Sequence, residues 1–358
     1  MVSLTAAFAQ TDKELDHYLA AHCYPITVNA DSSLFINDSL GSMLLRKMKG
    51  KSLFVYGEGW SHGLHTNNRI TNALIGFYAS HGLKGVFTES ARSWIVEDNY
   101  FLMHTGLSAA AFYPKEDAFY QRSFETKRQL YNKGQYQYLA IDFERPHSLY
   151  RVLNLLLQDL TPAQQQTVLK LMPYIQDTGW LKLSPQKFVS FYQEKRDRFY
   201  KDSIVLKNVI QQQYTLFRYL MSDPQPSEYH DNRNQQMADH ILQQAALYPD
   251  NDSMFLLDCG MAHTRPGKRD GLQKTTVHLF SASDRFRDKI VVMNLYGDSC
   301  QTDGNNWALD FMKGNILSGF KYAAKSPIVV FDLSDIPEQY RYIKDDYGEL
   351  LLYATKAD

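Results

Sequence analysis

Two short apolar runs in the first quarter of the chain end in carboxylates, and a histidine follows the first of them. The first run leads into Glu58, His62 stands four residues later, and the second run leads into Glu89. In an open α/β sheet the carboxyl ends of parallel strands meet at one edge, where ligands bind. A carboxylate beside an imidazole orients the ring and stabilises its protonated form, so the pair can take a proton from water and return it to a leaving group. This spacing therefore predicts acid–base catalysis at one edge of a sheet.

Three later residues fit the same pattern. Asp142 ends another apolar run, and His263 follows a further run after the short turn Gly260-Met261-Ala262. Arg233 begins an amphipathic helix, from which a guanidinium could reach an anionic substrate group or pair with a site carboxylate. We predict that the catalytic residues are Glu58, His62, Glu89 and His263, and that the substrate-binding residues are Asp142 and Arg233.

Each candidate also has a purely structural interpretation. Glu58 could cap the turn after its strand, and His62 could be a polar residue at the start of a helix. Asp142 could belong to a surface turn, and Arg233 could form a surface ion pair. Glu89 ends an apolar strand, where an unpaired charge is costly, so its position favours a function.

A strand–helix–strand unit surrounds the first candidates. An apolar run at 52–56 predicts a strand by its length, and Val86 and Phe87 belong to the next strand. Two strands joined by one helix with short turns imply parallel pairing and a right-handed crossover. The helix is predicted to stop at Gly82. Its buried face, at helical spacing, consists of Ile70, Ala73, Leu74, Phe77 and Tyr78.

The rest of the chain completes an α/β fold. Only helical periodicity is present between about 146 and 248, where Pro162 and Pro185 each follow an N-cap residue, as at the first position of a helix. We predict a central, mostly parallel sheet flanked by helices, in a single α/β domain of residues 11–358 with a helical insertion at about 146–248. Further strands are predicted near 138–142, 254–259, 290–295, 328–332 and 350–353.

Composition argues against several classes of function. The 358 residues are 44% hydrophobic, enough for a large core, and the net charge of -1 gives no electrostatic footprint for nucleic acid. No run approaches the roughly 18 apolar residues of a membrane span. Three scattered cysteines without CxxC spacing indicate neither a zinc site nor a disulfide framework. The sequence has no nucleophile-elbow, Walker A or dinucleotide-binding motif. The expected partner is a small-molecule substrate, and the oligomeric state stays open.

The first ten residues are similar to the end of a secretory signal. Ala7-Phe8-Ala9 followed by Gln10 has the small-x-small form of a cleavage site, whereas a basic start and a full apolar core are missing. Residues 1–10 are therefore a candidate signal-peptide remnant. Export to the periplasm or the extracellular space and a cytoplasmic location both stay open.

Several short motifs resemble the erythromycin esterase-like family, within a wider group that includes ChaN-type haem-binding lipoproteins and TraB/Tiki-type proteins. The family usually shows Gly-Glu-x-x-His-Gly, so the first motif here has one extra residue, and His240 stands where the family often has Asn. The motifs extend over nearly the whole chain and comprise Gly57-Glu58-x-x-x-His62-Gly63, Glu89 and Asp142 at strand ends, Arg233-x-x-x-Met237-Ala238, Gly260-x-Ala262-His263 and the closing run from Tyr347 to Tyr353.

The resemblance implies hydrolysis of an ester or lactone by an activated water, without an obligatory metal or other cofactor. On this basis His62 is the general base, Glu58 and Glu89 orient or polarise it, and His263 and Arg233 stabilise the oxyanion or the leaving group. Three alternatives stay open. One is a metal-dependent hydrolase of the Tiki kind, since imidazole and carboxylate suit Mn or Zn. The others are a binding protein for haem or another large ligand without turnover, and an inactive scaffold.

Overall fold

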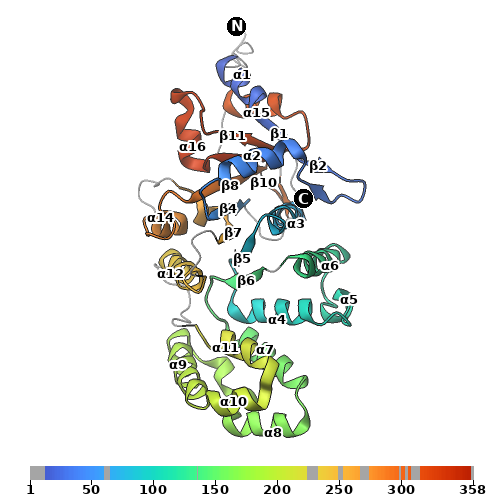
Figure 1. Cartoon of the computed structure of the whole chain (residues 1–358), viewed down its shortest axis with the longest axis vertical. Helices are drawn as coiled ribbons and strands as arrows, with labels where there is room; N and C mark the ends of the chain where they lie inside the picture. The colour runs from blue at the N-terminus through green and yellow to red at the C-terminus, as the bar shows by residue number, and fades with distance from the viewer. Residues whose placement is uncertain are drawn as a thin grey trace, which may run out of the picture. The chain divides into compact units, whose positions relative to one another are not determined.

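In the computed structural model the chain divides into two compact units, whose elements are labelled in Figure 1. The first unit consists of Met1–Phe87, Ala109–Gln137 and Leu242–Asp358, and the second of Thr88–Ser108 and Tyr138–Ile241. The candidate signal-peptide remnant at 1–10 lies outside the described residues. Those residues are 13–59, 65–134, 136–223, 233–248, 253–266, 274–297, 300–302, 305–307 and 315–355.

An eight-stranded, mostly parallel sheet is the central feature of the fold, as predicted. Its strands lie in the order β1-β11-β12-β8-β4-β7-β5-β6. Strands β12, β8, β4 and β7 pair in parallel, whereas β11 is antiparallel to both of its neighbours, β1 and β12. The bounds are β1 (Cys23–Pro25), β4 (Leu53–Glu58), β5 (Leu83–Thr88), β6 (Gln137–Ala140), β7 (Met254–Gly260), β8 (Ile290–Gly297), β11 (Ile328–Asp332) and β12 (Leu350–Ala354).

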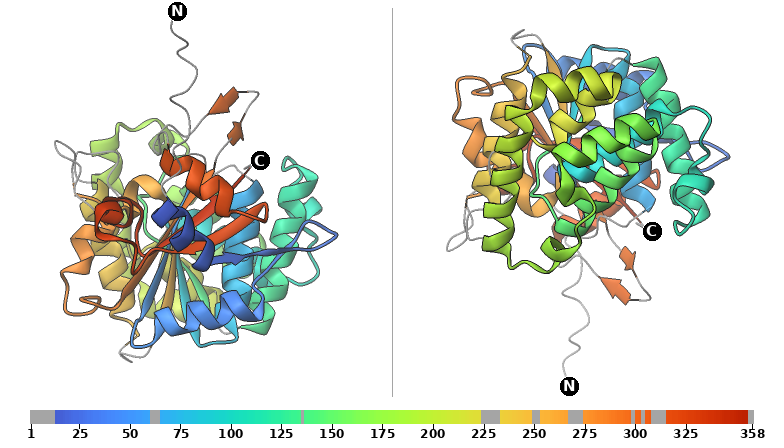
Figure 2. Two further views of the ribbon diagram at one scale, coloured as in Figure 1. Left: turned by 90° about the horizontal axis from the view of Figure 1, so that it is seen from above. Right: turned by 90° about the horizontal axis from the view of Figure 1, so that it is seen from below.

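The central strands are buried on both faces, which explains their continuous apolar sequences. In the first unit, helices cover both faces of the sheet (Figure 2). Helix α3 (His65–Ala79) lies on one face, where the Tyr56 hydroxyl of β4 donates a hydrogen bond to Asn67 Oδ1 at 3.0 Å. Helix α16 (Arg341–Tyr347) lies on the other, where Asn294 of β8 donates to the Tyr347 carbonyl. Two layers of helices therefore enclose the strands that carry the candidate residues.

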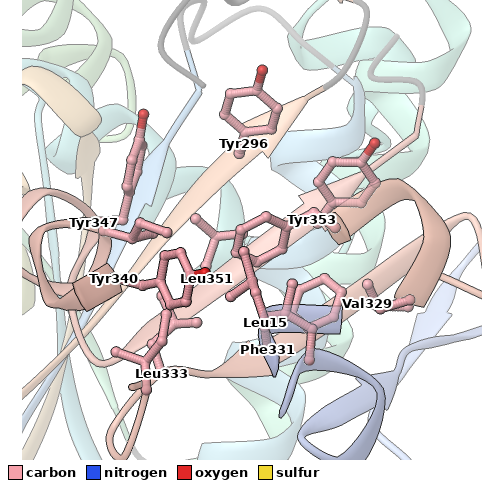
Figure 3. Close-up of a cluster of buried hydrophobic side chains, with 14 of the residues drawn as sticks. Leu15, Tyr296, Val329, Phe331, Leu333, Tyr340, Tyr347, Leu351 and Tyr353 are labelled. Atoms are coloured by element: carbon pink, nitrogen blue, oxygen red, sulfur yellow. The ribbon is translucent and has the colours of Figure 1, made fainter. Parts of the chain in front are cut away.

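A cluster of buried side chains joins the sheet to α1 (Lys13–Ala21), α15 (Asn315–Ala323) and α16. It contains Leu15 of α1, Phe320 of α15, and Phe331 and Tyr353 of the neighbouring strands β11 and β12. Figure 3 shows these strand side chains beside Tyr296 of β8, whose ring stacks on that of Tyr353 with centroids 5.9 Å apart. Each fully buried side chain of this size stabilises the fold by roughly 1.5–3 kcal/mol. The cluster thus fastens the antiparallel edge of the sheet to its helices.

The second unit is largely helical. Helix α8 begins with a capping box between Thr161 and Gln164, and Pro162 and Pro185 are the first residues of α8 and α9, as predicted. All regular elements that the structure describes between 146 and 248 are helices, although the unit also takes in 88–108. The α-helices of this unit are α4 (Arg92–Met103), α7 (Pro146–Gln158), α8 (Pro162–Leu171), α9 (Pro185–Lys201), α10 (Ser203–Ile210), α11 (Tyr214–Leu220) and most of α12 (Arg233–Ala245).

The remaining elements are short or peripheral. None of the described helices is both long and apolar enough to cross a membrane. The sequence did not predict β1 or the two-residue strands β2 (Thr27–Val28) and β3 (Leu34–Phe35), which are too short to show a periodic pattern. The other α-helices of the first unit are α2 (Asp38–Met48), α5 (Ala109–Phe112), α6 (Ala118–Lys133), α13 (Met261–Thr264) and α14 (Thr276–Ser281).

Candidate active site

Close packing on one face of the sheet requires a glycine at the carboxyl end of β4. A Cβ atom on Gly57 would lie 1.7 Å from Asn294 Oδ1 and 2.2 Å from Thr264 Oγ1. Thr264 Oγ1 donates a hydrogen bond to Asn294 Oδ1, and Asn294 Nδ2 donates to the carbonyl of Tyr347 at 2.6 Å. These contacts fix the strand end that carries Glu58, because an interior packed this densely has no space for an added methyl group.

Glu58 and Asp258 share the other face of the sheet. In the parallel pair of β4 and β7, Tyr56 is level with Asp258, and Glu58 is level with Gly260. Side chains alternate along a strand, so Glu58 and Asp258 are diagonal neighbours on the face that α3 covers. From α3, Thr71 Oγ1 donates a hydrogen bond to Asp258 Oδ2 at 3.0 Å.

The carboxyl groups of Glu58 and Asp258 lie within hydrogen-bonding distance of each other. Burial raises the pKa of Asp258 well above its usual range, and the charge and hydrogen bond of Glu58 raise it further. The hydrogen bond from Thr71 and the charge of Lys127 lower this pKa, but less strongly. Asp258 is not among the site residues predicted from the sequence, although an acid inside the apolar run 254–259 is costly to bury and so indicates a partner.

The structure describes only one of the two predicted histidines of the first unit. His62 falls within residues 60–64 and so lies outside the described residues. His263 is half-buried in α13, a single turn that follows β7 directly and contacts β4, β7 and β8. Thr264 fastens this turn to the sheet through Asn294. Among the residues that the structure describes, no group of three His, Cys, Asp or Glu side chains could hold a metal ion.

In the second unit, the structure brings three predicted residues together. Arg233 Nη2 donates to Glu89 Oε1 at 2.5 Å and to Asp142 Oδ2 at 2.8 Å, and Arg233 Nε donates to Asp142 Oδ1 at 3.2 Å. The Glu89 and Asp142 side chains are only 7% and 8% exposed, against 20% for Arg233. Burial lowers the pKa of Arg233, but the hydrogen bonds and charges of the two carboxylates outweigh it and hold the pKa above its usual value.

Helix α12 also contacts the segment around Asp142 through His240, about two turns beyond Arg233. The His240 Nδ1 atom lies 2.9 Å from the carbonyl oxygen of Ile141, and its Nε2 atom lies 3.3 Å from Asp223 Oδ1. The residue before Asp142 is therefore tied to the same helix that supplies Arg233.

A buried polar network continues from Asp223, and our sequence analysis did not anticipate it. Arg92 Nε lies 3.8 Å from Asp223 Oδ2, and Arg92 Nη1 donates to Ser222 Oγ. Nearby, Glu144 accepts hydrogen bonds from the backbone and hydroxyl of Ser93 at 3.0 and 2.6 Å. Burial raises the pKa of Glu144 to about 7, the charge of Asp223 adds to this, and the hydrogen bonds from Ser93 and Arg145 oppose it. Only the tertiary structure reveals this network, because its members are scattered along the sequence.

Comparison with solved structures shows that the fold is shared. A crystal structure of a succinoglycan biosynthesis protein superposes with a TM-score of 0.62 at 12% identity, covering 96% of this chain and 97% of that one. A protein from Bacillus cereus gives 0.60 at 12% identity, again covering 96% and 97%. A mutant of the erythromycin esterase EreC, in its open conformation, gives 0.59 at 13% identity and covers 94% of this chain and 97% of that chain.

Sequence comparison adds no closer relationship. No protein-family model matches the chain, and no curated protein matches it. The likeness to solved structures therefore establishes a structural relationship at the level of the fold.

Proposed function

We propose that this protein is a hydrolase of an ester or lactone that uses an activated water and requires no metal. The observation that carries the proposal is the placement of Glu58, held at the carboxyl end of a buried parallel strand beside a second carboxyl group. This is the edge at which α/β proteins bind ligands. The erythromycin esterase among the structural neighbours supports the same class of reaction.

In the proposed mechanism, His62 takes a proton from water while the Glu58 carboxylate orients the imidazole and stabilises its charged form. The hydroxide attacks the acyl carbon, and His263 stabilises the oxyanion or the leaving group by donating a hydrogen bond. His62 then returns its proton to the leaving alcohol oxygen. Proton transfer of this kind contributes typically 10²–10⁴-fold to the rate.

For the second unit taken by itself, we propose that the Arg233 cluster binds an uncharged polar group of a small molecule. One guanidinium is shared by the carboxylates of Glu89 and Asp142, so the three groups together carry a net charge of about -1 when both acids are ionised. Such a cluster repels a substrate carboxylate but can accept a hydrogen bond from a hydroxyl group. Glu89, which we predicted to be catalytic, would here bind that group together with Asp142 and Arg233.

A hydrolysis screen over simple esters and macrolide lactones tests this function, with and without a chelator. We expect chelator-resistant turnover in the native protein, a loss of at least about 100-fold in His62→Ala, and no change in the matched control His147→Ala, whose side chain is exposed. Chelator-sensitive turnover with stoichiometric bound metal would overturn the metal-free mechanism. Silence across the panel together with a Soret band on haem titration would favour a ligand-binding function.

A further inference from the structure

We propose that Glu58 and Asp258 share one proton, that Asp258 holds it, and that Asp258 thereby acts as a positioning residue that keeps Glu58 ionised and fixed in direction. The catalytic part of this inference rests on the proposed function. The state of the two carboxyl groups does not, because it follows from their contacts alone.

The contact between the two carboxyl groups depends on which of them can donate a hydrogen bond. An ionised carboxylate only accepts hydrogen bonds, so two ionised carboxylates cannot form a hydrogen bond with each other. The contact between Glu58 and Asp258 therefore requires a proton on one of them. Two like charges at this distance would also repel strongly, which is why paired carboxyl groups retain a proton to unusually high pH.

Of the two carboxyl groups, Asp258 is the one that holds the proton. This residue lies two positions before the end of β7, and its Oδ1 atom is buried and accepts no hydrogen bond from a described residue. The donor from Thr71 goes to Oδ2. Glu58, by contrast, is the last residue of β4. Ionising Asp258 would place an unsolvated charge on Oδ1, which is costly, and the raised pKa of Asp258 agrees with this assignment.

The other titratable groups around the pair do not reverse the assignment. Tyr56 of β4 is fully buried, and its own pKa is raised by burial and then by the charges of Glu58 and Asp258, so it remains neutral. On α6, the positive charge of Lys127 lowers the pKa of Asp258, but it is the weakest of the influences on that group. Tyr120 of the same helix stays protonated beside Glu58, since burial and neighbouring acids raise its pKa.

The protonated pair has a chemical consequence at the site. A neutral Asp258 donates its hydrogen bond to Glu58, so Glu58 keeps its negative charge and one oxygen is held in place. When Asp258 ionises at higher pH, that hydrogen bond is lost and the two carboxylates repel each other. We therefore expect activity that depends on Glu58 to decline on the alkaline side.

Infrared spectroscopy of the 358-residue chain tests the protonation state directly. At neutral pH, where Glu97 and Glu144 also contribute, the native protein should show one component of the protonated-carboxyl stretch that is lost in Asp258→Asn. The matched control Asp284→Asn, at a side chain that is 97% exposed, should retain it. Glu58→Gln should retain the band but lose it at a lower pH than the native protein, since the charge of Glu58 is removed while Asp258 stays buried. A native spectrum without this band, or one unchanged in Asp258→Asn, would overturn the proposal.

Denaturant unfolding over a pH series gives a second readout that needs no substrate. The folded-state pKa of Asp258 is raised, so its stabilising effect is complete below the unfolded value of about 3.9 and is lost as pH rises towards the folded-state value. Over that window, one linked proton changes the unfolding equilibrium constant about tenfold per pH unit. Asp258→Asn should remove that tenfold-per-unit change, and equal pH dependence in the two proteins would contradict the assignment.

Turnover separates the positioning role from the proposed reaction. On any ester that the native protein hydrolyses, Asp258→Asn should keep kcat near neutral pH and lose the alkaline decline, because an amide N–H still donates to Glu58. Asp258→Ala should lose at least about tenfold in kcat with little change in KM. An infrared band without any turnover would contradict the proposed hydrolase function and would still support the shared proton. Turnover with the same alkaline decline in Asp258→Asn would refute the positioning role alone.

Discussion

The two units of this protein each hold a pair of acids beside a compensating charge, and the kind of charge differs between the units. In the first unit, Glu58 and Asp258 contact each other directly, and a proton is the compensating charge that we infer. In the second, Glu89 and Asp142 are both bound to the guanidinium of Arg233. A guanidinium stays charged at any accessible pH, whereas a shared proton can leave. We therefore expect the first pair to lose its compensating charge as pH rises, whereas the second cluster keeps its own.

Removing the guanidinium should abolish the difference between the two pairs of acids. It should also have the largest effect on stability. Arg233→Met leaves two buried carboxyl groups without their cation, which costs about 3–5 kcal/mol in comparable buried ion pairs. The variant cluster should then resemble the first pair, with an unfolding free energy that falls as pH rises, because one acid must retain a proton. Denaturant unfolding at several pH values measures both effects.

Two further variants make the Arg233→Met result specific. Arg287→Met removes an arginine from an ion pair whose side chains are 63% and 97% exposed, so it should change stability by less than about 1 kcal/mol. Adding Glu89→Gln and Asp142→Asn to Arg233→Met should recover part of the lost stability. A loss in Arg233→Met no greater than in Arg287→Met would show that Arg233 does not compensate the two acids.

A methyl group on Gly57 should disturb the contact between Glu58 and Asp258 and leave the Arg233 cluster unchanged. Gly57→Ala would force its Cβ to within 1.7 Å of Asn294 Oδ1, and overpacking of this kind costs typically 1–3 kcal/mol. The displaced strand end should also weaken the Glu58–Asp258 contact, seen as a shift of the carboxyl infrared band. The matched control is Gly106→Ala, where a Cβ meets open space. Equal stability of the two variants would mean that β4 relaxes freely at this position.

The smallest effect is expected where one partner of an ion pair is exposed. Arg151 and Glu97 of the second unit form an ion pair in which the arginine side chain is 60% exposed. Burial nevertheless raises the pKa of Glu97 to about 7, and the charge of Arg151 opposes that rise. Arg151→Ala should cost less than about 1 kcal/mol, measured by denaturant unfolding at neutral pH. A loss as large as that of Arg233→Met would show that exposure does not distinguish these arginines.

Most of the fold could be predicted from the sequence, because the central strands are buried on both faces and read as continuous apolar runs. The predicted strand at 52–56 corresponds to β4, and Gly82 does follow the end of α3, with a positive φ of 90°. The exceptions are informative. β1 has three residues, ends in Pro25 and lies at the edge of the sheet, so its pairing with β11 supports it more than its own sequence does.

The candidate site could be predicted only in part, for physical reasons that differ between residues. The sequence placed Glu58 at a strand end, but its contact with Asp258 depends on β7 lying next to β4, which no local pattern encodes. The sequence left open whether Arg233 binds a substrate anion or a carboxylate of the site. In the structure it forms ion pairs with Glu89 and Asp142. The role of His62 remains a prediction, since this residue lies outside the described part of the chain.

The contacts around Gly57 also have a consequence for engineering this protein. Positions 57, 264 and 294 come from three separate segments, yet they compete for one small volume beside the sheet. A library that varies position 57 alone should return almost nothing but glycine. Joint randomisation, with Asn294 and Thr264 free to become smaller, should recover alanine or serine at position 57 in combinations that no single substitution reveals. These three positions are therefore best treated as one unit of variation, and the same coupling should shape how the chain diversifies.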